Sequence, residues 1–581
     1  MGISVGHNRG ASISIDGVIR YAISNERLTR IKTDRSDSIP VESMRYCISA
    51  LGISYEDIDL FVYNTTEDTN NVEAEFTKET GLSTEKLQFL PHHLAHAFSV
   101  FCASGFDESA VIVADAMGSV YNDKTPIKEW FKLDESLMPE DGRQLAEGYS
   151  IYHFSRPKNQ AEAIYTKWVP YPMFDTDTNA SIGFMYGTGT RQLVYSPRTH
   201  TWQAGKLMGL ASYAEPAFMS GYESPLILED MDMQVSAELK SPHVNHESDF
   251  QAKANAAGMY QYDQETASLH LAKMAKNMTG SDHICAAGGS FLNCNTNEAI
   301  IKSGMFEDCY FLHAADDSGI PIGLAYYGYS FLTGKMPMPE LEGRNLLLGL
   351  KDTKVLTPYL GREYAESEIE EAFKLVNFRM SYFRYDFEAD LIEAVANLLS
   401  ENKVVAWFQG GSEMGPRALG NRSILASPKY GWMTNYINSE IKHREWYRPF
   451  APSVLFERQG EIFDLDTYSP YMLVTAKVKP EWQAKIPAVT HHDGTARYQS
   501  VTELNNPKYH ALISSFADKT GIPVLLNTSF NGPEEPIVET PLNALNTFYK
   551  QGIHAIALGN YLIIRESWKN HKTSKSASMR W

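Results

Sequence analysis

The chain has few cysteines, and they follow no disulfide or ligand spacing. Its 581 residues include only five, which are Cys47, Cys102, Cys285, Cys294 and Cys309. The number is odd and no two are spaced Cys-x-x-Cys, which disfavours both a disulfide framework and a zinc ribbon. We therefore expect reduced thiols, as in a cytoplasmic protein.

Long apolar runs and an excess of positive charge are also lacking. No apolar run reaches the roughly 18 residues that a membrane-spanning helix needs. The start, MGISVGHNRGASISIDG, has neither the basic nor the apolar region of a signal peptide. The net charge of -19 argues against broad nonspecific binding of nucleic acid, although it is compatible with a local groove for a polyanion. We expect a cytoplasmic protein without a membrane partner.

The length and the alternation of elements predict several α/β domains. A chain of 581 residues can bury more than one core. Apolar strands end in glycine turns that lead into helices, which is typical of an α/β fold. Expected strands include 61–64, 110–115, 283–289, 404–410 and 523–531, and expected helices include 91–101 and 391–400. A proline-rich stretch over 335–358 predicts a domain boundary, and no internal repeat is evident.

A cationic island interrupts this acidic chain. Between Ser412 and Phe450 six basic residues face three acidic ones, and Arg417 and Arg422 lie in the glycine-rich segment GPRALGNRS. Guanidinium groups beside glycine suit the binding of phosphate, because the backbone can come close to the ligand. The segment predicts an anion site. The alternative is a solvated helix face, but glycine and proline punctuation is not typical of one.

A second motif, HHLAHA, predicts a metal site. On a helix, His92 and His96 would lie on one face, one turn apart. Asp115 ends an apolar strand, and Asp317 lies in a glycine-bounded segment. Imidazole and carboxylate ligands together suit Fe, Zn or Mn. The alternative is a pair of hydrogen-bonded histidines in an apolar core.

Several polar groups follow predicted strands. Gly288 and Gly289, with Asn293, could hold a nucleotide phosphate through backbone N–H groups, or mark a tight turn. His7 follows the first strand and is either structural or a general base. In the second half, the groups suited to an anion or a carbonyl are Arg497, Asn527 and Ser529, and a hydrogen-bonded turn is the alternative.

The segment 121–190 interleaves aromatic and basic residues, among them Tyr149, Arg156 and Trp168. Such a pattern could stack on a flat or anionic acceptor. The alternative is a variable insertion with a small core of its own.

Together these motifs resemble the NodU/CmcH family of O-carbamoyltransferases. They lie in family order over nearly the whole chain: HHLAHA (92–97), VADAMGS (113–119), GKLMGLASY (205–213), AAGGSFLN (286–293), DDSGIPIG (316–323), GSEMGPRALGNRSIL (411–425), INSEIKHREWYRPFAPSVL (437–455), HHDGTARYQSV (491–501) and PVLLNTSFNGPEEPIV (523–538).

The resemblance implies an α/β architecture with two catalytic domains. An actin-like (ASKHA) domain would span 1–345, a linker 346–380, a YrdC-like α/β domain 381–553 and a C-terminal tail 554–581. The YrdC-like domain would make carbamoyl-adenylate from carbamoyl phosphate and ATP, the latter with Mg²⁺. The actin-like domain would transfer the carbamoyl group to an acceptor hydroxyl.

The resemblance also implies roles for individual residues. His92, His96, Asp115 and Asp317 would hold the metal, with Fe²⁺ favoured over Zn or Mn. The carbamoyl-phosphate and ATP grip would comprise Arg417, Lys442, Arg448, Arg497, Asn527 and Ser529. Gly288, Gly289 and Asn293 would contact the adenylate, and His7 would be the base for the acceptor hydroxyl. Asn8 stands where the family usually has Asp.

The acceptor and the oligomeric state are left open. The acceptor is a small natural product or sugar, or a 5-hydroxymethylpyrimidine as a nucleotide or in DNA, and a homodimer is one option. Two other functions remain: an ASKHA-fold kinase or ATPase acting on a small alcohol, and a non-catalytic module that binds nucleotide or RNA. Release of ADP, or binding without turnover, would distinguish them.

Overall fold

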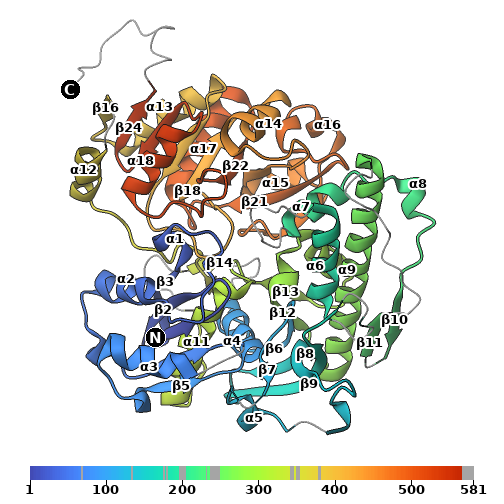
Figure 1. Cartoon of the computed structure of the whole chain (residues 1–581). Coiled ribbons are helices and arrows are strands. Elements are labelled where there is room, and N and C mark those ends of the chain that lie inside the picture. The colour runs from blue at the N-terminus through green and yellow to red at the C-terminus, as the bar shows by residue number, and fades with distance from the viewer. Residues whose placement is uncertain are drawn as a thin grey trace, which may run out of the picture. The chain divides into compact units, whose positions relative to one another are not determined.

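Two compact α/β units make up the chain in this computed structural model (Figure 1). The described residues are 1–66, 70–122, 124–132, 135–174, 177, 181–194, 204–230, 232–235, 249–339, 346–348, 354–376 and 381–565. The first unit extends to Leu356, apart from Arg30–Lys32 and Leu347–Leu350, which group with the second unit from Thr357 onward. No helix in the described part of the chain is both long and apolar enough to cross a membrane.

The first unit begins with a five-stranded sheet of order β3-β2-β1-β4-β5. Its strands are β1 (Gly2–Ser4), β2 (Gly10–Ile15), β3 (Val18–Ser24), β4 (Phe61–Asn64) and β5 (Leu87–Phe89). The first three are antiparallel, whereas β4 is parallel to β1, and β5 to β4. Helices α2 (Val41–Leu51) and α3 (Asn70–Thr80) belong to the same half of the unit.

A second sheet repeats this topology. Its strands are β6 (Glu108–Ala114), β7 (Val120–Tyr121), β8 (Gln144–Ser155), β9 (Gln160–Tyr171), β12 (His283–Ala287) and β13 (Asp308–Phe311). Without β7, which pairs with β8, the order is β9-β8-β6-β12-β13, again three antiparallel strands followed by two parallel ones. Such a doubled sheet is the arrangement of an actin-like domain. The predicted α/β fold class is confirmed, although the sequence shows no repeat.

The hairpin β8–β9 corrects one expectation about the segment 121–190. Tyr149, Tyr152 and Phe154 on β8 are fully or almost fully buried. The hairpin supplies two strands of the main sheet, so it is not an insertion with a core of its own. Its aromatic residues were ambiguous because long aromatic strands can face either a core or a ligand.

Two helices carry the link between the sheets. Helix α11 (Ile320–Thr333) packs on β1, β2 and β4 of the first sheet, and α4 (His92–Ser104) packs on β6 and β12 of the second. The helices also pack closely on each other, because a Cβ at Gly323 would lie only 1.8 Å from the Ala95 carbonyl oxygen. The long helix α9 (Phe250–Thr279) contacts α6 (Ile182–Val194), α7 (Ala204–Ala211) and α10 (Cys294–Lys302).

The second unit is built on a nine-stranded mixed sheet of order β16-β24-β23-β17-β18-β22-β19-β21-β20. The strands are β16 (Tyr382–Arg384), β17 (Val405–Phe408), β18 (Arg422–Ala426), β19 (Ala451–Leu455), β20 (Val474–Lys477), β21 (Thr495–Val501), β22 (Val524–Ser529), β23 (Ala555–Leu558) and β24 (Tyr561–Ile564). The main helices are α12 (Glu366–Leu375), α13 (Glu388–Ser400), α17 (Pro507–Thr520) and α18 (Pro541–Lys550). The specific YrdC-like assignment stays a prediction.

The expected limits of this domain need correction. Strands β23 and β24 fall in the segment assigned to a tail from 554 onward, yet β23 pairs with β17 in the middle of the sheet. Their apolar side chains are buried. The two strands were not predicted because the turn in the middle of AIALGNYLII leaves only a short apolar run on each side. Helix α12 likewise lies within the expected linker 346–380. Residues 566–581, the basic end of the expected tail, lie outside the described residues.

Candidate metal centre and cationic site

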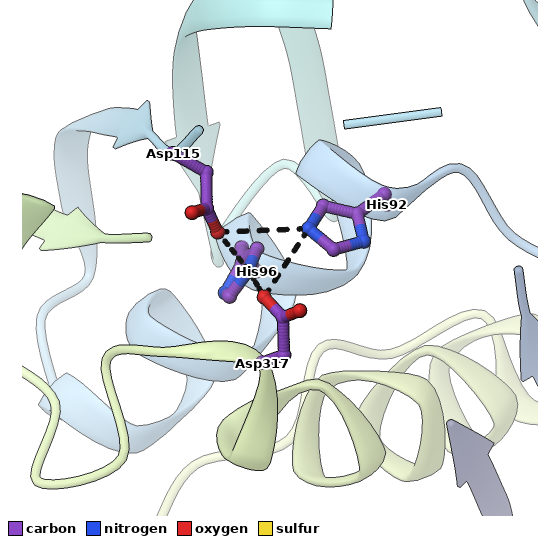
Figure 2. Close-up of side chains that lie close together, drawn as sticks. All are labelled: His92, His96, Asp115 and Asp317. Atoms are coloured by element: carbon purple, nitrogen blue, oxygen red, sulfur yellow. Dashed lines mark ion pairs between the residues drawn. The ribbon is translucent and has the colours of Figure 1, made fainter. Parts of the chain in front are cut away.

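Four side chains of the first unit converge on one point. Their ligand atoms lie within 4.8 Å of one another and belong to His92, His96, Asp115 and Asp317. Nε2 of His96 is 3.3 Å from Asp115 Oδ2 and 3.5 Å from Asp317 Oδ1. Nε2 of His92 is 3.7 Å and 3.5 Å from the same two oxygens, as Figure 2 shows. The structure thus brings together all four residues that the sequence predicts as metal ligands.

The fold explains why these groups meet. Helix α4 places His92 and His96 one turn apart, with ring centres 4.8 Å from each other. Asp115 directly follows the carboxyl end of β6, and Asp317 opens the short turn (η5, Asp317–Gly319) that leads into α11. The close crossing at Gly323 fixes α11 against α4, and therefore Asp317 against the two histidines.

The donor atoms of this cluster fit a divalent cation. Nε2 of His92, Nε2 of His96 and Oδ2 of Asp115 are buried and form no hydrogen bond with any described group. Buried polar atoms are rarely left in this state, since each costs roughly 1–3 kcal/mol. Two imidazole nitrogens and two carboxylate oxygens suit Fe²⁺, Zn²⁺ or Mn²⁺, and the donor set does not choose among them.

The charges of the cluster also favour a bound cation. Burial alone would raise the pKa of Asp115, but its contacts with His92 and His96 hold that pKa well below its usual range. Burial alone would lower the pKa of His96, but Asp115 and Asp317 raise it to about 9. Both shifts show a pair of ionised carboxylates that needs a positive partner, which is either a proton on imidazole or a metal ion.

Groups around the cluster orient its ligands. Nδ2 of Asn64, at the end of β4, lies 3.2 Å from Nδ1 of His92. The buried carboxylate of Glu147 accepts hydrogen bonds from the backbone N–H groups of Ser119 (2.9 Å) and His93 (3.4 Å). It thereby fastens the start of α4 to the loop after Asp115. Supporting groups of this kind are typical of metal sites.

Sequence reasoning missed both supporting residues. Asn64 had a weak signal, because it is a polar residue at the end of an apolar strand. Glu147 had none, since it acts through partners 28 and 54 residues away.

His7 lies at the edge of the cluster. Its Nδ1 is 3.5 Å from Asp317 Oδ2, and 49% of its side chain is exposed. Burial would lower the pKa of His7, but hydrogen bonding to Asp317 and the nearby carboxylates raise it. The adjacent Asn8 donates a hydrogen bond to Asp316 Oδ2 over 3.3 Å, so Asp316 supplies a carboxylate beside His7 although residue 8 is not Asp.

The glycine turn after β12 borders the same site. Gly288 has a φ of +97°, and a Cβ there would lie 2.2 Å from the Ala114 carbonyl oxygen. A Cβ at Gly289 would lie 3.1 Å from Asp115 Oδ1. Gly183, which sequence reasoning missed, also allows a close backbone approach beside Asp115, because a Cβ there would lie 2.5 Å from the Ala116 nitrogen. Glycine is therefore required at 288 and 183, where a Cβ would meet backbone, while a Cβ at 289 would crowd the Asp115 side chain.

Asn293 lies in the same loop, but its side chain is already engaged. It caps helix α10 and exchanges two hydrogen bonds with Gln261, at 2.9 Å and 3.1 Å. A contact between this side chain and an adenylate would require those bonds to break, so its predicted role is the weakest of the set.

In the second unit, Lys442 and Ser529 form the centre of a cationic site. Lys442 ends a π-helical turn (η7, Ile437–Lys442). Its Nζ donates to Ser529 Oγ (3.2 Å) and to Asn531 Oδ1 (2.7 Å) at the end of β22. Burial, followed by the charges of Arg444 and other cations, holds the pKa of Lys442 well below its usual range. A group in this state gains from a nearby anion.

Arg444 and Arg448 lie close to this lysine, and Arg497 lies close to both arginines. Burial lowers the pKa of Arg444 and of Arg448, and each also feels the charge of Arg497. The ion pair of Arg448 with Glu445 is a long one, since its Nη1 is 3.9 Å from Glu445 Oε2. Cations held together in this way favour a multiply charged anion such as a phosphate.

The loop that carries Arg417 is anchored at several points. Glu413 Oε1 accepts from the backbone N–H groups of Leu419 and Asn421, at 2.7 Å and 2.8 Å. Asn527 Nδ2 donates to the Ala418 carbonyl over 3.2 Å. Asn527 thus supports the loop that holds Arg417, and its amide nitrogen is committed to that task.

Arg422, the second arginine of the motif, has a structural role. It is fully buried on β18, donates to the Gln409 carbonyl over 2.7 Å, and lies 3.6 Å from the centre of the Phe408 ring. The expectation of two guanidinium groups facing one ligand is therefore wrong for Arg422. The motif alone could not reveal that its second half is a strand.

Two protein-family models match most of the chain. The Carbamoyltransferase N-terminus family matches residues 70–326, and the Carbamoyltransferase C-terminus family matches residues 396–565. The chain belongs to the carbamoyltransferase family, and its class of activity is that of a transferase.

Relatives cover most of the chain. An uncharacterised protein of Synechocystis sp. is 30% identical, over 96% of this chain and 95% of its own length. Nodulation protein NolO of Bradyrhizobium diazoefficiens is 30% identical, over 81% of this chain and 78% of its own length. A crystal structure of full-length HypF, in the phosphate- and nucleotide-bound form, is 16% identical over 58% of this chain and 56% of that one. Its TM-score of 0.34 is too low to support an argument.

Proposed function

We propose that the protein is an ATP-dependent O-carbamoyltransferase that uses carbamoyl phosphate. The observation that carries this proposal is the presence of two sites of opposite charge in a chain of the carbamoyltransferase family. The first unit has a buried anionic cluster suited to a metal, and the second has a cationic cluster suited to phosphates.

The first half-reaction would take place at the cationic site. Water releases phosphate from carbamoyl phosphate, and an oxygen of the resulting carbamate attacks the α-phosphorus of ATP. The products are carbamoyl-adenylate and pyrophosphate. Arg417, Lys442, Arg448 and Arg497, with the Ser529 hydroxyl, would bring the two anions together and stabilise the charge that develops. Mg²⁺ would accompany ATP as a co-substrate ion.

The second half-reaction would take place beside the metal cluster. Gly288 and Gly289 would let the adenylate come close to the backbone, and Asn293 would contact it if its present hydrogen bonds open. His7 would take the proton from the acceptor hydroxyl, whose oxygen attacks the carbamoyl carbon while AMP leaves. A bound Fe²⁺, Zn²⁺ or Mn²⁺ would supply Lewis acidity, and we favour Fe²⁺. A closed site would keep water from the reactive anhydride.

The acceptor is proposed only as a class. A small natural product or sugar and a 5-hydroxymethylpyrimidine, free or in DNA, both offer the hydroxyl that the chemistry needs. The aromatic hairpin β8–β9 gives little support to the pyrimidine, because Tyr149 and Tyr152 are buried in the core. We therefore favour a small molecule.

The deciding experiment needs no acceptor. Purified protein with ATP, carbamoyl phosphate and Mg²⁺ is expected to release pyrophosphate, and only when carbamoyl phosphate is present. Adding Fe²⁺ and a pool of hydroxyl compounds should then give AMP and a carbamoylated product, detected by mass spectrometry. Release of ADP would instead indicate a kinase or ATPase. Nucleotide binding with no turnover, even with acceptors, would indicate a binding module.

A further inference from the structure

A cavity at the edge of the first sheet lies outside both sites described above. It has a volume of about 510 Å³ and is lined by Tyr63, Glu73, Gln88, Phe89, Glu129 and Trp130, among others. Its walls come from β4, β5, α3 and the short helix α5 (Ile127–Trp130). The volume falls in the range of roughly 300–1,000 Å³ that is typical of small-molecule sites.

The lining combines aromatic rings with carboxylates. Tyr63 and Phe89 meet edge to face with ring centres 5.6 Å apart, and Trp130 packs edge to face on Tyr327 at 6.1 Å. Gln88 Nε2 donates to the Tyr327 hydroxyl over 3.2 Å, which holds that wall in place. Aromatic faces attract cations within about 6 Å of the ring centre.

No described residue neutralises the acids of the cavity. Among the residues that the structure describes, neither Glu73 nor Glu129 forms an ion pair within 4 Å. Two nearby lysines are directed elsewhere: Lys86 Nζ donates to the Ile58 carbonyl over 2.7 Å, and Lys128 Nζ lies 5.4 Å from the Tyr121 ring centre. The cavity therefore carries net negative charge.

The side chain of Tyr63 also faces this space. Tyr63 lines the cavity and is only 3% exposed, yet its hydroxyl forms no hydrogen bond with another described residue. Burial, and then the charges of Glu73 and Glu129, raise the pKa of this hydroxyl, which shows that both carboxylates lie near it although they come from different helices. The hydroxyl of this largely buried ring reaches the cavity and has no hydrogen-bond partner among the described residues, so a ligand in the cavity can bond to it.

We propose that this cavity binds the primary ammonium group of an organic amine. The carboxylates of Glu73 and Glu129 and the Tyr63 hydroxyl accept its N–H groups, and the rings of Phe89 and Trp130 pack on the charge and on the adjoining carbon chain. A neutral alcohol would leave the carboxylates without a counter-charge, and an anion would be repelled.

A pair of probes with the same shape tests the charge. The full-length protein is titrated calorimetrically with 3-methylbutylamine, which is protonated at neutral pH, and in parallel with 3-methylbutan-1-ol. Neither ATP nor carbamoyl phosphate is present, so the result is independent of the proposed carbamoyl transfer. We expect the amine to bind at least about tenfold more tightly than the alcohol.

Variants then locate the binding. Trp130→Leu and the pair Glu73→Gln with Glu129→Gln should each weaken amine binding about tenfold. These side chains are at least partly exposed, so the fold should survive, and thermal melting checks it. Glu56→Gln, an exposed acid of the same unit outside the cavity, is the matched control. Equal binding of the alcohol, no binding of the amine to the unsubstituted protein, or unchanged binding by the Trp130 and Glu73/Glu129 variants would overturn the proposal.

Discussion

The two candidate sites solve opposite electrostatic problems. In the first unit, carboxylates and imidazoles meet at 3.3–3.7 Å and leave buried donor atoms without hydrogen bonds. In the second unit, cations are gathered, and the central one, Lys442, is already held by oxygens of Ser529 and Asn531. The first site is suited to a cation and the second to an anion. This difference indicates that one chain is suited to two chemically distinct ligands.

The difference also predicts separable defects. A substitution in the second unit should remove the first half-reaction and leave the metal, whereas one in the first unit should do the reverse.

Arg417→Ala should lower carbamoyl-phosphate-dependent release of pyrophosphate by about 10²–10³-fold, the loss typical of one charge-stabilising group. Metal content, measured by elemental analysis, should not change. Arg458→Ala is the matched control, because that half-exposed arginine forms an ion pair with its helix neighbour Glu461, away from the cationic site. Normal pyrophosphate release by Arg417→Ala would contradict its place in the phosphate site.

His92→Ala should lower metal affinity by at least about a hundredfold, since even supporting groups of metal sites contribute 10–100-fold. Carbamoyl transfer to the acceptor should fall with it, while pyrophosphate release persists. His510→Ala, which removes an imidazole paired with Glu457 in the second unit, is the control. An unchanged metal content would show that the four residues hold no metal.

His7→Asn should slow transfer by about a hundredfold, at the low end for a general base, because half of the ring is exposed. Adenylate formation should be spared. The measurement compares pyrophosphate release with product formation in the same preparation. An equal loss in both would argue against His7 as the base and for a structural role.

Binding of pyrophosphate should depend on pH through Lys442. The pKa of Lys442 is lowered in the free protein, and a bound anion would raise it. Binding should therefore take up protons, and affinity should fall by a few fold as the pH rises from about 7 to about 9. Calorimetry in buffers of different ionisation enthalpy measures this uptake. Lys442→Arg should abolish it, because arginine stays protonated; uptake that persists would assign the proton elsewhere.

The sequence predicted the metal cluster better than the cationic site, for a physical reason. Helical spacing relates His92 to His96 directly, and strand ends position Asp115, so local rules suffice. Arg422 was misjudged because charge does not tell which face of a strand is buried. Glu147 had no signal, since its hydrogen bonds depend on how distant segments meet.

The fold shows the same limit. The strand at 61–64 was predicted with its observed limits, because apolar runs and turns are local features. The doubled topology was invisible in the sequence, since the two sheets share an order of strands and not a series of residues. The hairpin β8–β9 and the final strands β23 and β24 were missed for a related reason: pairing with remote strands, rather than composition, defines them.

Each of the two helices between the sheets packs on the sheet that it does not follow in the chain. Helix α4 follows the first sheet in the chain but covers the second, and α11 follows the second sheet but covers the first. If one half of the first unit unfolds, the sheet of the other half loses the helix that packs on it. We therefore expect the two halves to unfold together. A metal bound by residues of α4 and by Asp317 at the start of α11 would link the two helices and stabilise their packing. At a concentration of about a hundred times its Kd, the proposed metal would stabilise the whole unit by about 2.7 kcal/mol, so that it would also contribute to folding.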